Sequence, residues 1–368
     1  MRIDGRHPQS ARPIRVTAAG GVITAVEPIA DRPGLPTLAP GFFDPQINGA
    51  SGVSFNAPTL TADDVHAVVA KCRAHGLAGF APTLVTGPFD ALRHGFATLA
   101  SLDDLAATIP VFHLEGPYLS AEDGPRGAHP REHVRPPDAD EFDRLQDAAR
   151  GRIRLVTLAP ELPGALGFIE HLRRGDVVVA LGHTAATPAQ LRDAVRAGAT
   201  VSTHLGNGCH ATLPRHDNVI WAQLADDRLT AGFIPDGDHL PASVVTCLLR
   251  VKTVARLFVT CDASSLAGCP PGRYPTWGGE FEVTESGRVV VPGTPYLAGS
   301  GHFTDTCFER LLNGHGVSLA DALALTTRNA RTLLGLPVPT LEVGQPAELI
   351  AVTETPAGWR VSPASAGR

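Results

Sequence analysis

The chain has 368 residues, of which 43% are hydrophobic and 18% charged, and its net charge at neutral pH is −6. This composition indicates a water-soluble globular protein with one large domain, or a large and a small one. The negative charge argues against a nucleic-acid-binding surface, which needs a basic face. No apolar run approaches the roughly 20 residues that cross a bilayer.

The sequences at the two ends of the chain indicate the cellular location of the protein and a small second domain. The first residues, MRIDGRHPQSARPIRV, lack the apolar stretch of a signal peptide, so we expect a cytoplasmic protein. Residues 1–39 and 336–368 are strand-like pieces separated by turn residues, and each is too short to form a domain alone. We expect them to form a small β-sandwich together, which leaves residues 40–335 as the large domain.

The large domain contains eight short apolar runs that end in polar residues and alternate with helical patterns. Buried parallel strands have this near-continuous apolar character, and each pair of them needs a crossover helix. Eight such units favour an α/β fold of the (β/α)8 TIM-barrel type over an open doubly wound sheet. The first run is also followed by no glycine-rich phosphate loop. Residues 316–336 form an amphipathic pattern that predicts a helix under the barrel.

Four of the runs end in a residue that can bind a metal or transfer a proton. These residues are Glu115 in FHLEGP, His183 in ALGHT, His204 in STHLGN and Asp262 in VTCDA. Functional side chains of a barrel lie at the carboxyl ends of its strands. A lone histidine in an apolar run is more often a core residue, but burying an unpaired carboxylate is costly. Two histidines and Glu115 are a donor set for zinc that leaves a position open for water.

The order and spacing of several motifs resemble one enzyme family. The motifs are APGFFDPQINGASG, APTLVT, HLEGPYLS with RGAHP, LAPE, GHTAA, THLGN, DGDH, CDASSLAG and LAGS. On these motifs the chain resembles the amidohydrolase superfamily and, within it, the N-acetylglucosamine-6-phosphate deacetylase family. The resemblance implies a barrel with a terminal β-sandwich, a homodimer, and an enzyme of amino-sugar metabolism. Its members hydrolyse the acetamide of N-acetylglucosamine 6-phosphate, a linear amide, to glucosamine 6-phosphate and acetate.

The resemblance also implies roles for individual residues. Glu115, His183 and His204 would bind one divalent metal, for which we expect Zn²⁺, with Fe²⁺ or another ion as alternatives. A metal-bound water would be the nucleophile, and Asp262 would act as general base and then as general acid.

The first strand departs from the usual amidohydrolase pattern. The superfamily usually carries His-x-His there, whereas this chain has Gln46 and Asn48. Some members of the resembled family carry Gln-x-Asn and work with one metal, so we expect these to be vestigial second-metal positions. Lysine is almost absent: only Lys71 and Lys252 occur, and the fourth strand has none. The sequence therefore argues against a binuclear site bridged by a carbamylated lysine.

Substrate contacts are also carried over from the resemblance. His129 and His239 match substrate histidines, and Asn207 and Gly208 take the position of the phosphate-binding segment. Arg215 falls where the family has an arginine that reaches the partner subunit's site in a homodimer.

The segment around Arg215, HLGNGCHATLPRHDN, differs from the family pattern, and this difference leaves the identity of the substrate undecided. Gly206 replaces a bulky residue, His210 and His216 are new, and His302 in LAGSGHFTD is given no role. The alternatives are a pocket for another N-acyl sugar or an N-acyl amino acid, with no nucleic acid or membrane as partner. A non-catalytic binding protein on the same scaffold is the alternative of a different class.

Overall fold

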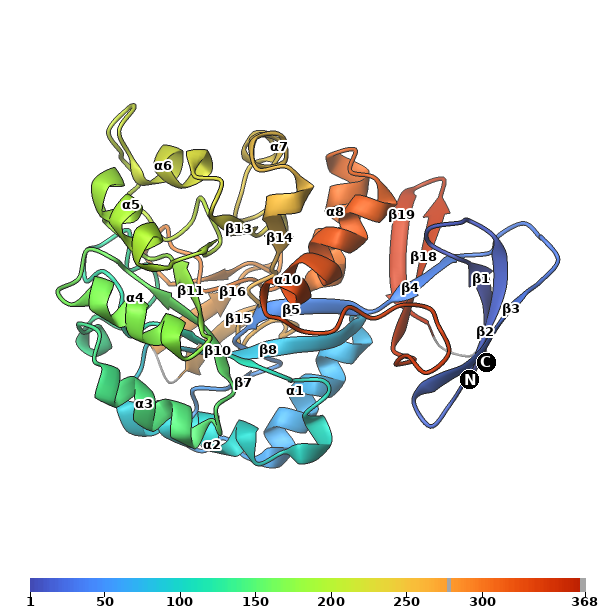
Figure 1. The fold of residues 1–368 in the computed structure, drawn as a ribbon, viewed down its shortest axis with the longest axis horizontal. Helices are drawn as coiled ribbons and strands as arrows, with labels where there is room; N and C mark the ends of the chain where they lie inside the picture. Colours follow the sequence, from blue (N-terminus) through green and yellow to red (C-terminus); the bar gives the residue numbers. More distant parts are fainter. Residues whose placement is uncertain (277–278, 365–368) are drawn as a thin grey trace.

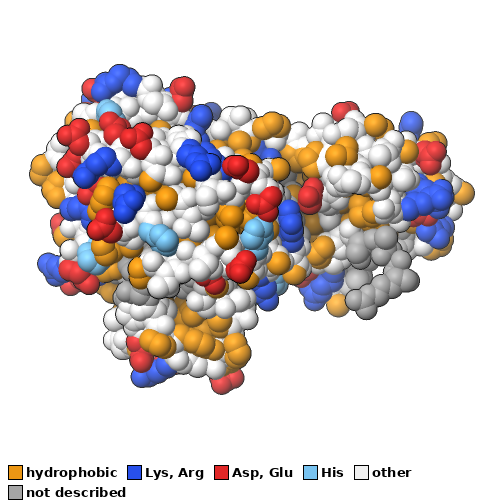
Figure 2. Space-filling view, turned by 90° about the horizontal axis from the view of Figure 1, so that it is seen from below, with side chains coloured by type: hydrophobic (Ala, Val, Ile, Leu, Met, Phe, Trp, Pro, Cys, Tyr) orange, Lys and Arg blue, Asp and Glu red, His pale blue; other side chains and the backbone are white. Residues whose placement is uncertain are grey.

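The structure is a computed structural model, and it describes residues 1–276 and 279–364. A large barrel of strands and helices lies beside a smaller sheet that contains both ends of the described chain (Figure 1). Acidic, basic and hydrophobic side chains are mixed over the face drawn in Figure 2. Among the described residues, no helix is long and apolar enough to cross a membrane.

The barrel is one sheet of eight parallel strands, hydrogen-bonded in chain order, so the predicted TIM barrel is confirmed. It closes between its first and last strands, where Ile47 bridges to Ala263 and the Asn48 amide donates to the Ala263 carbonyl at 2.9 Å. Each strand falls in one of the eight predicted runs, although β8 begins at Leu77, one residue ahead of its run AGFAPTLVT. The strands are β5 (Phe42–Ile47), β8 (Leu77–Val85), β9 (Phe112–Glu115), β10 (Ile153–Leu158), β11 (Val178–Leu181), β12 (Val201–Ser202), β13 (Thr230–Phe233) and β14 (Leu257–Val259).

Helices surround the barrel, and two of them begin with complete capping boxes. Thr61 accepts from the Asp64 amide ahead of α1, and Thr187 accepts from the Gln190 amide ahead of α5. Such caps stabilise a helix by about 1 kcal/mol because they satisfy free backbone donors. The helices are α1 (Ala62–Ala74), α2 (Phe89–Ala100), α3 (Ala139–Ala148), α4 (Ala165–Arg174), α5 (Pro188–Ala197), α6 (Val219–Ala225), α7 (Ala242–Val251) and α8 (Thr304–Gly314).

The helical stretch expected under the barrel is formed by α9 (Leu319–Leu323), a π-helical segment (Ala324–Arg328) and α10 (Asn329–Leu333). Ala330 and Leu334 pack in one buried cluster with Phe43, Val111 and other residues from the amino ends of the strands. This helix therefore closes the bottom of the barrel, and the opposite end is left for the site.

The small domain is a six-stranded sheet built from both ends of the chain, in the order β19-β18-β4-β1-β2-β3. The edge strand β3 meets the segment just ahead of β18, where the Ile23 amide donates to the Gln345 carbonyl at 2.8 Å. The sheet therefore curls on itself. We propose the division at residues 1–39 with 336–368, of which 365–368 lie outside the described part. Its strands are β1 (Arg2–Arg6), β2 (Pro13–Ala19), β3 (Val22–Pro28), β4 (Thr37–Pro40), β18 (Leu349–Thr355) and β19 (Gly358–Pro363).

Two small sheets lie outside this plan. One is the pair β6 (Gly49–Ala50) and β7 (Val53–Ser54), directly after β5. The other follows β14 and comprises β15 (Gly272–Thr276), β16 (Gly279–Val283) and β17 (Val289–Val290) in antiparallel order. We call this three-stranded sheet the flap. The sequence pattern did not distinguish the flap from the repeated strand–helix units of the barrel.

Candidate metal centre and active site

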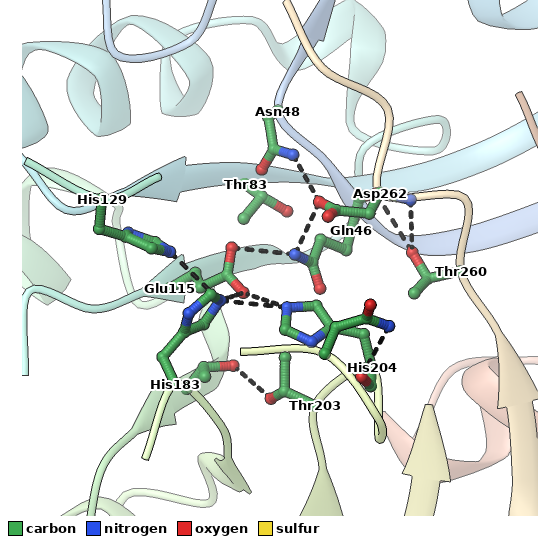
Figure 3. Close-up of polar contacts among 12 residues, drawn as sticks. Gln46, Asn48, Thr83, Glu115, His129, His183, Thr203, His204, Thr260 and Asp262 are labelled. Atoms are coloured by element: carbon green, nitrogen blue, oxygen red, sulfur yellow. Dashed lines mark hydrogen bonds and ion pairs between the residues drawn. The ribbon is translucent and has the colours of Figure 1, made fainter. Parts of the chain in front are cut away.

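The four residues singled out at strand ends converge at one end of the barrel (Figure 3). Glu115 is the last residue of β9, and His183 and His204 each lie two residues after β11 and β12. Asp262 lies three residues after β14. All four are buried. The fold thus brings together residues that are 147 positions apart in the sequence at their extremes, 115 and 262.

Three of these residues have strained backbone conformations. The φ angles are 49° at His183, 24° at His204 and 54° at Asp262, in the left-handed region that side chains other than glycine rarely adopt. Each such residue costs on the order of 1–3 kcal/mol, and such strain clusters at active sites and ligand clamps. All three residues lie in the segments that follow their strands.

Glu115, His183 and His204 form a compact donor cluster. The Oε1 atom of Glu115 lies 3.1 Å from His204 Nε2 and 3.4 Å from His183 Nε2, and the two nitrogens are 3.2 Å apart. Ligand atoms about 2.0–2.1 Å from a tetrahedral ion are separated by roughly 3.3 Å. The spacing of the three atoms therefore fits one divalent metal, which these residues could hold together.

Hydrogen bonds around the cluster set its histidine tautomers. His183 Nδ1 lies 2.9 Å from the Pro125 carbonyl, which can only accept, so Nδ1 carries the proton and Nε2 presents a lone pair to the cluster. His129 Nδ1 lies 3.0 Å from Thr86 Oγ1, and its Nε2 faces His183 Nε2 at 3.3 Å. Because His183 Nε2 carries a lone pair, His129 Nε2 can donate a hydrogen bond to it while His129 Nδ1 accepts from Thr86 Oγ1.

The charges of the cluster shift its pKa values. Burial opposes ionisation of Glu115, but hydrogen bonds and charges of His183 and His204 outweigh it and hold the pKa of the carboxyl well below its usual range. Burial also disfavours the charged form of His204, yet the hydrogen bond to Glu115 leaves its pKa raised. Burial and the nearby His183 lower the pKa of His129 to about 3. The site therefore keeps an anionic carboxylate beside a neutral His129.

Gln46 and Asn48 hold Asp262 in place. Gln46 Nε2 donates to both Glu115 Oε2 and Asp262 Oδ1 at 2.9 Å, and Asn48 Nδ2 donates to the same Oδ1 at 2.7 Å (Figure 3). A neutral amide thus lies between two carboxylates. Burial and the Glu115 charge raise the pKa of Asp262 to about 6.

Asp44 supports this arrangement through buried hydrogen bonds, and it was not among the residues predicted from the sequence. Its buried carboxylate accepts from Thr260 Oγ1 at 2.6 Å, from the Cys261 amide at 2.8 Å and from Thr304 Oγ1 at 2.7 Å. It thereby ties β5 to the end of β14 beside Asp262. An acid within the apolar run GFFDPQ was the available signal, because a buried carboxylate needs partners.

A cavity of about 670 Å³ opens above the cluster. Four of the expected substrate contacts line it: His129, Asn207, Gly208 and His239, and the unassigned His210 lines it as well. Arg215 and His216 are exposed and do not line the cavity of their own subunit. His210 pairs with Glu122 at 3.2 Å, and His302 lies 3.4 Å from Asp238.

A second carboxylate–histidine pair orients His239. Its Nδ1 lies 2.8 Å from Asp236 Oδ2, which also accepts from Ser300 Oγ at 2.7 Å. Burial opposes the charge on Asp236, but the hydrogen bond and charge of His239 prevail and hold the pKa of the carboxyl well below its usual range. The acid three residues ahead of the histidine in DGDH signalled this pair, and the sequence analysis did not use it.

Comparison with known proteins decides the family. No family model matches the chain. Human N-acetylglucosamine-6-phosphate deacetylase is 36% identical over 86% of this chain and 80% of its own. N-acetylgalactosamine-6-phosphate deacetylase of Escherichia coli O157:H7 is 32% identical over 91% of this chain and 89% of its own. The chain belongs to the N-acetylglucosamine-6-phosphate deacetylase family of the amidohydrolase superfamily.

A solved structure of this deacetylase family matches the whole architecture. An Asp-to-Ala variant of N-acetyl-D-glucosamine-6-phosphate deacetylase from Mycobacterium smegmatis, in complex with N-acetyl-D-glucosamine-6-phosphate, has a TM-score of 0.86. It is 31% identical to this chain, and the match covers 98% of each. The named relatives are deacetylases, so the chain is an amidohydrolase that acts on a linear amide.

Proposed function

We propose that this deacetylase hydrolyses the acetamide of N-acetylglucosamine 6-phosphate to glucosamine 6-phosphate and acetate. The observation that carries the proposal is the convergence of Glu115, His183, His204 and Asp262 on one cavity. The Mycobacterium smegmatis relative that matches over 98% of the chain was solved with this phosphorylated sugar. A binding protein without catalysis would have no need to keep all four residues with this geometry.

One divalent metal would complete the site, and Zn²⁺ suits its donor set best. Glu115, His183 and His204 would hold the ion, which would polarise the acetamide carbonyl and make water more acidic. Gln46 and Asn48 replace histidine ligands and donate to carboxylates instead, which supports a single metal position.

Asp262 would transfer the protons of the reaction. The side-chain amides of Gln46 and Asn48 both donate to Asp262 Oδ1. Its Oδ2 is therefore left to take a proton from the attacking water. Asp262 would then return that proton to the departing amine, because an amide nitrogen leaves poorly unless it is protonated. A pKa raised to about 6 lets the carboxylate be ionised at neutral pH and still carry a proton during turnover.

The remaining predictions about the substrate contacts and the assembly extend this proposal. His129, Asn207, Gly208 and His239 would contact the sugar and its phosphate from within the subunit. Arg215 would reach the site of the partner in a homodimer, and its exposed position outside its own cavity supports that role. All six cysteines are free, which supports a cytoplasmic location, where thiols stay reduced.

A second candidate substrate is N-acetylgalactosamine 6-phosphate. The relative from Escherichia coli O157:H7, which is named for that sugar, is 32% identical over 91% of this chain. The rewritten segment 206–216 forms one wall of the cavity through Gly206, Gly208 and His210. Because this wall differs from the family pattern, another N-acyl sugar and an N-acyl amino acid remain alternative substrates.

Acetate release tests the proposal. The Zn²⁺-supplied protein is assayed with N-acetylglucosamine 6-phosphate, its galacto isomer and unphosphorylated N-acetylglucosamine. We expect a preference of at least 100-fold for the phosphorylated glucosamine, roughly 2.7 kcal/mol of transition-state binding. Equal turnover of all three sugars would contradict the phosphate pocket, and less than about 0.2 metal per chain without rescue by Zn²⁺ would favour the binding protein.

A further inference from the structure

The cavity has an uneven charge lining. Three carboxylates line it, on Glu115, Asp238 and Asp262. Among the described residues that line it, Arg288 is the single lysine or arginine. A phosphate dianion that enters the cavity is repelled by these carboxylates, and charges a few ångströms apart interact by several kcal/mol in such surroundings. Besides a bound metal, Arg288 is the permanent positive charge that can offset this repulsion within one subunit.

Arg288 lies on the flap, immediately before β17. Its Nε is 3.8 Å from Asp238 Oδ1, and Asp238 precedes His239, which also lines the cavity. The other carboxylate oxygen of Asp238 lies 3.4 Å from His302 Nε2. Asp238 therefore lies between Arg288 on the flap and His302 at the start of the segment that leads into α8.

This contact leaves most of the guanidinium available to a ligand. A guanidinium presents five N–H donors in a planar fork, and the contact to Asp238 is made through Nε at 3.8 Å. The Arg288 side chain remains 44% exposed while it lines the cavity. Two parallel N–H groups of such a fork match two phosphate oxygens, and a lysine cannot reproduce that geometry.

We propose that Arg288 binds the phosphate group of the substrate from within the same subunit and so makes the pocket selective for phosphorylated sugars. This inference rests on the proposed function, whose carried-over arginine, Arg215, does not line its own cavity. Arg288 contributes charge and orientation at the phosphate, and it takes no part in the proton transfers at Asp262. Asp238 acts as a positioning residue that keeps the guanidinium at the cavity.

Calorimetry of the full-length, Zn²⁺-loaded protein tests Arg288 without requiring turnover. Binding of glucosamine 6-phosphate and of glucosamine is measured for the wild type, Arg288→Ala, Arg288→Lys and Arg273→Ala. Arg273 is the matched control, because it lies on the same flap, pairs with Glu280 and Glu282, and does not line the cavity. Thermal melting of each variant checks that it is folded.

We expect Arg288→Ala to reduce the preference for the phosphorylated sugar at least tenfold, Arg288→Lys to reduce it less, and Arg273→Ala to change it less than twofold. An unchanged preference in Arg288→Ala would overturn the inference, and so would a wild type that binds both sugars equally. If the wild type prefers glucosamine 6-phosphate through Arg288 but releases no acetate, the proposed hydrolysis fails while the phosphate role of Arg288 stands.

Discussion

The floor of the cavity and its rim are built in different ways. At the floor, Glu115, His183 and His204 follow barrel strands directly, are buried, and contact one another at 3.1–3.4 Å. At the rim, Arg288 lies on the flap with a weak 3.8 Å contact to Asp238, and Arg215 lies on an exposed loop that does not line the cavity of its own subunit. The floor is held by the scaffold, whereas the rim depends on segments outside the barrel repeat.

The difference separates chemistry from specificity. Groups that transfer protons or hold a metal need positions within a fraction of an ångström, which strand ends and buried hydrogen bonds provide. Groups that select a substrate can lie on loops, which tolerate change more readily. Substitutions at the floor should therefore abolish reaction with every substrate, and substitutions at the rim should change the relative preference among substrates.

The largest expected effect comes from removing a ligand at the floor. His183→Ala should lower metal content below about 0.2 per chain and reduce acetate release by about a thousandfold or more, because two donors hold a divalent ion poorly. Metal analysis and acetate release measure both effects. His210→Ala, at the rim, is the matched histidine control and should keep its metal. Full metal content in His183→Ala would show that the cluster is not the metal site.

Replacing the proton-transfer residue should separate metal binding from turnover. Asp262→Asn should keep the metal while turnover falls by about 10²–10⁴-fold, since only the proton transfer is lost. Metal analysis and single-turnover acetate release on the same sample make the comparison. Turnover close to that of the wild type would exclude Asp262 as the base.

The rate should fall on the acid side as Asp262 becomes protonated. Only the ionised carboxylate can accept a proton, and burial with the Glu115 charge raises the pKa of Asp262 to about 6. A bound cation favours the ionised form, so we expect kcat/KM to decline as pH falls through about 6 or lower. Gln46→Ala removes the donor between the carboxylates and should move this decline to higher pH. An identical pH profile in that variant would contradict the role of Gln46.

The smallest effect is expected at the rim. Arg215→Ala should raise KM for N-acetylglucosamine 6-phosphate by about 10- to 100-fold and affect the unphosphorylated sugar much less, because a charged hydrogen bond to phosphate contributes about 1.5–3 kcal/mol. Steady-state kinetics with both sugars gives the two ratios. Equal changes for both sugars would remove Arg215 from the phosphate site.

The sequence predicted the barrel well because its signals are local and repeated. Each apolar run produced one parallel strand of the barrel. The ends of those runs also located Glu115, His183, His204 and Asp262, since parallel strands present their carboxyl ends at the same side of a barrel.

Other features could not be predicted from one sequence, because they depend on contacts between distant segments. The amide of Gln46 contacts residues 69 and 216 positions away, and Asp44 contacts residues more than 200 positions away. The flap lies outside the strand–helix repeat, so nothing in its sequence placed Arg288 at the cavity. The left-handed backbone of His183, His204 and Asp262 also follows from tertiary structure, since only a few per cent of residues other than glycine adopt it.

A metal titration of the stripped protein tests the central claim most directly, namely that the strand ends form a single-metal deacetylase site. Acetate release from N-acetylglucosamine 6-phosphate is followed while Zn²⁺ is added in known amounts. We predict that activity rises linearly and reaches its plateau at one metal per chain. A plateau at two metals per chain, or full activity in the stripped protein, would contradict this account.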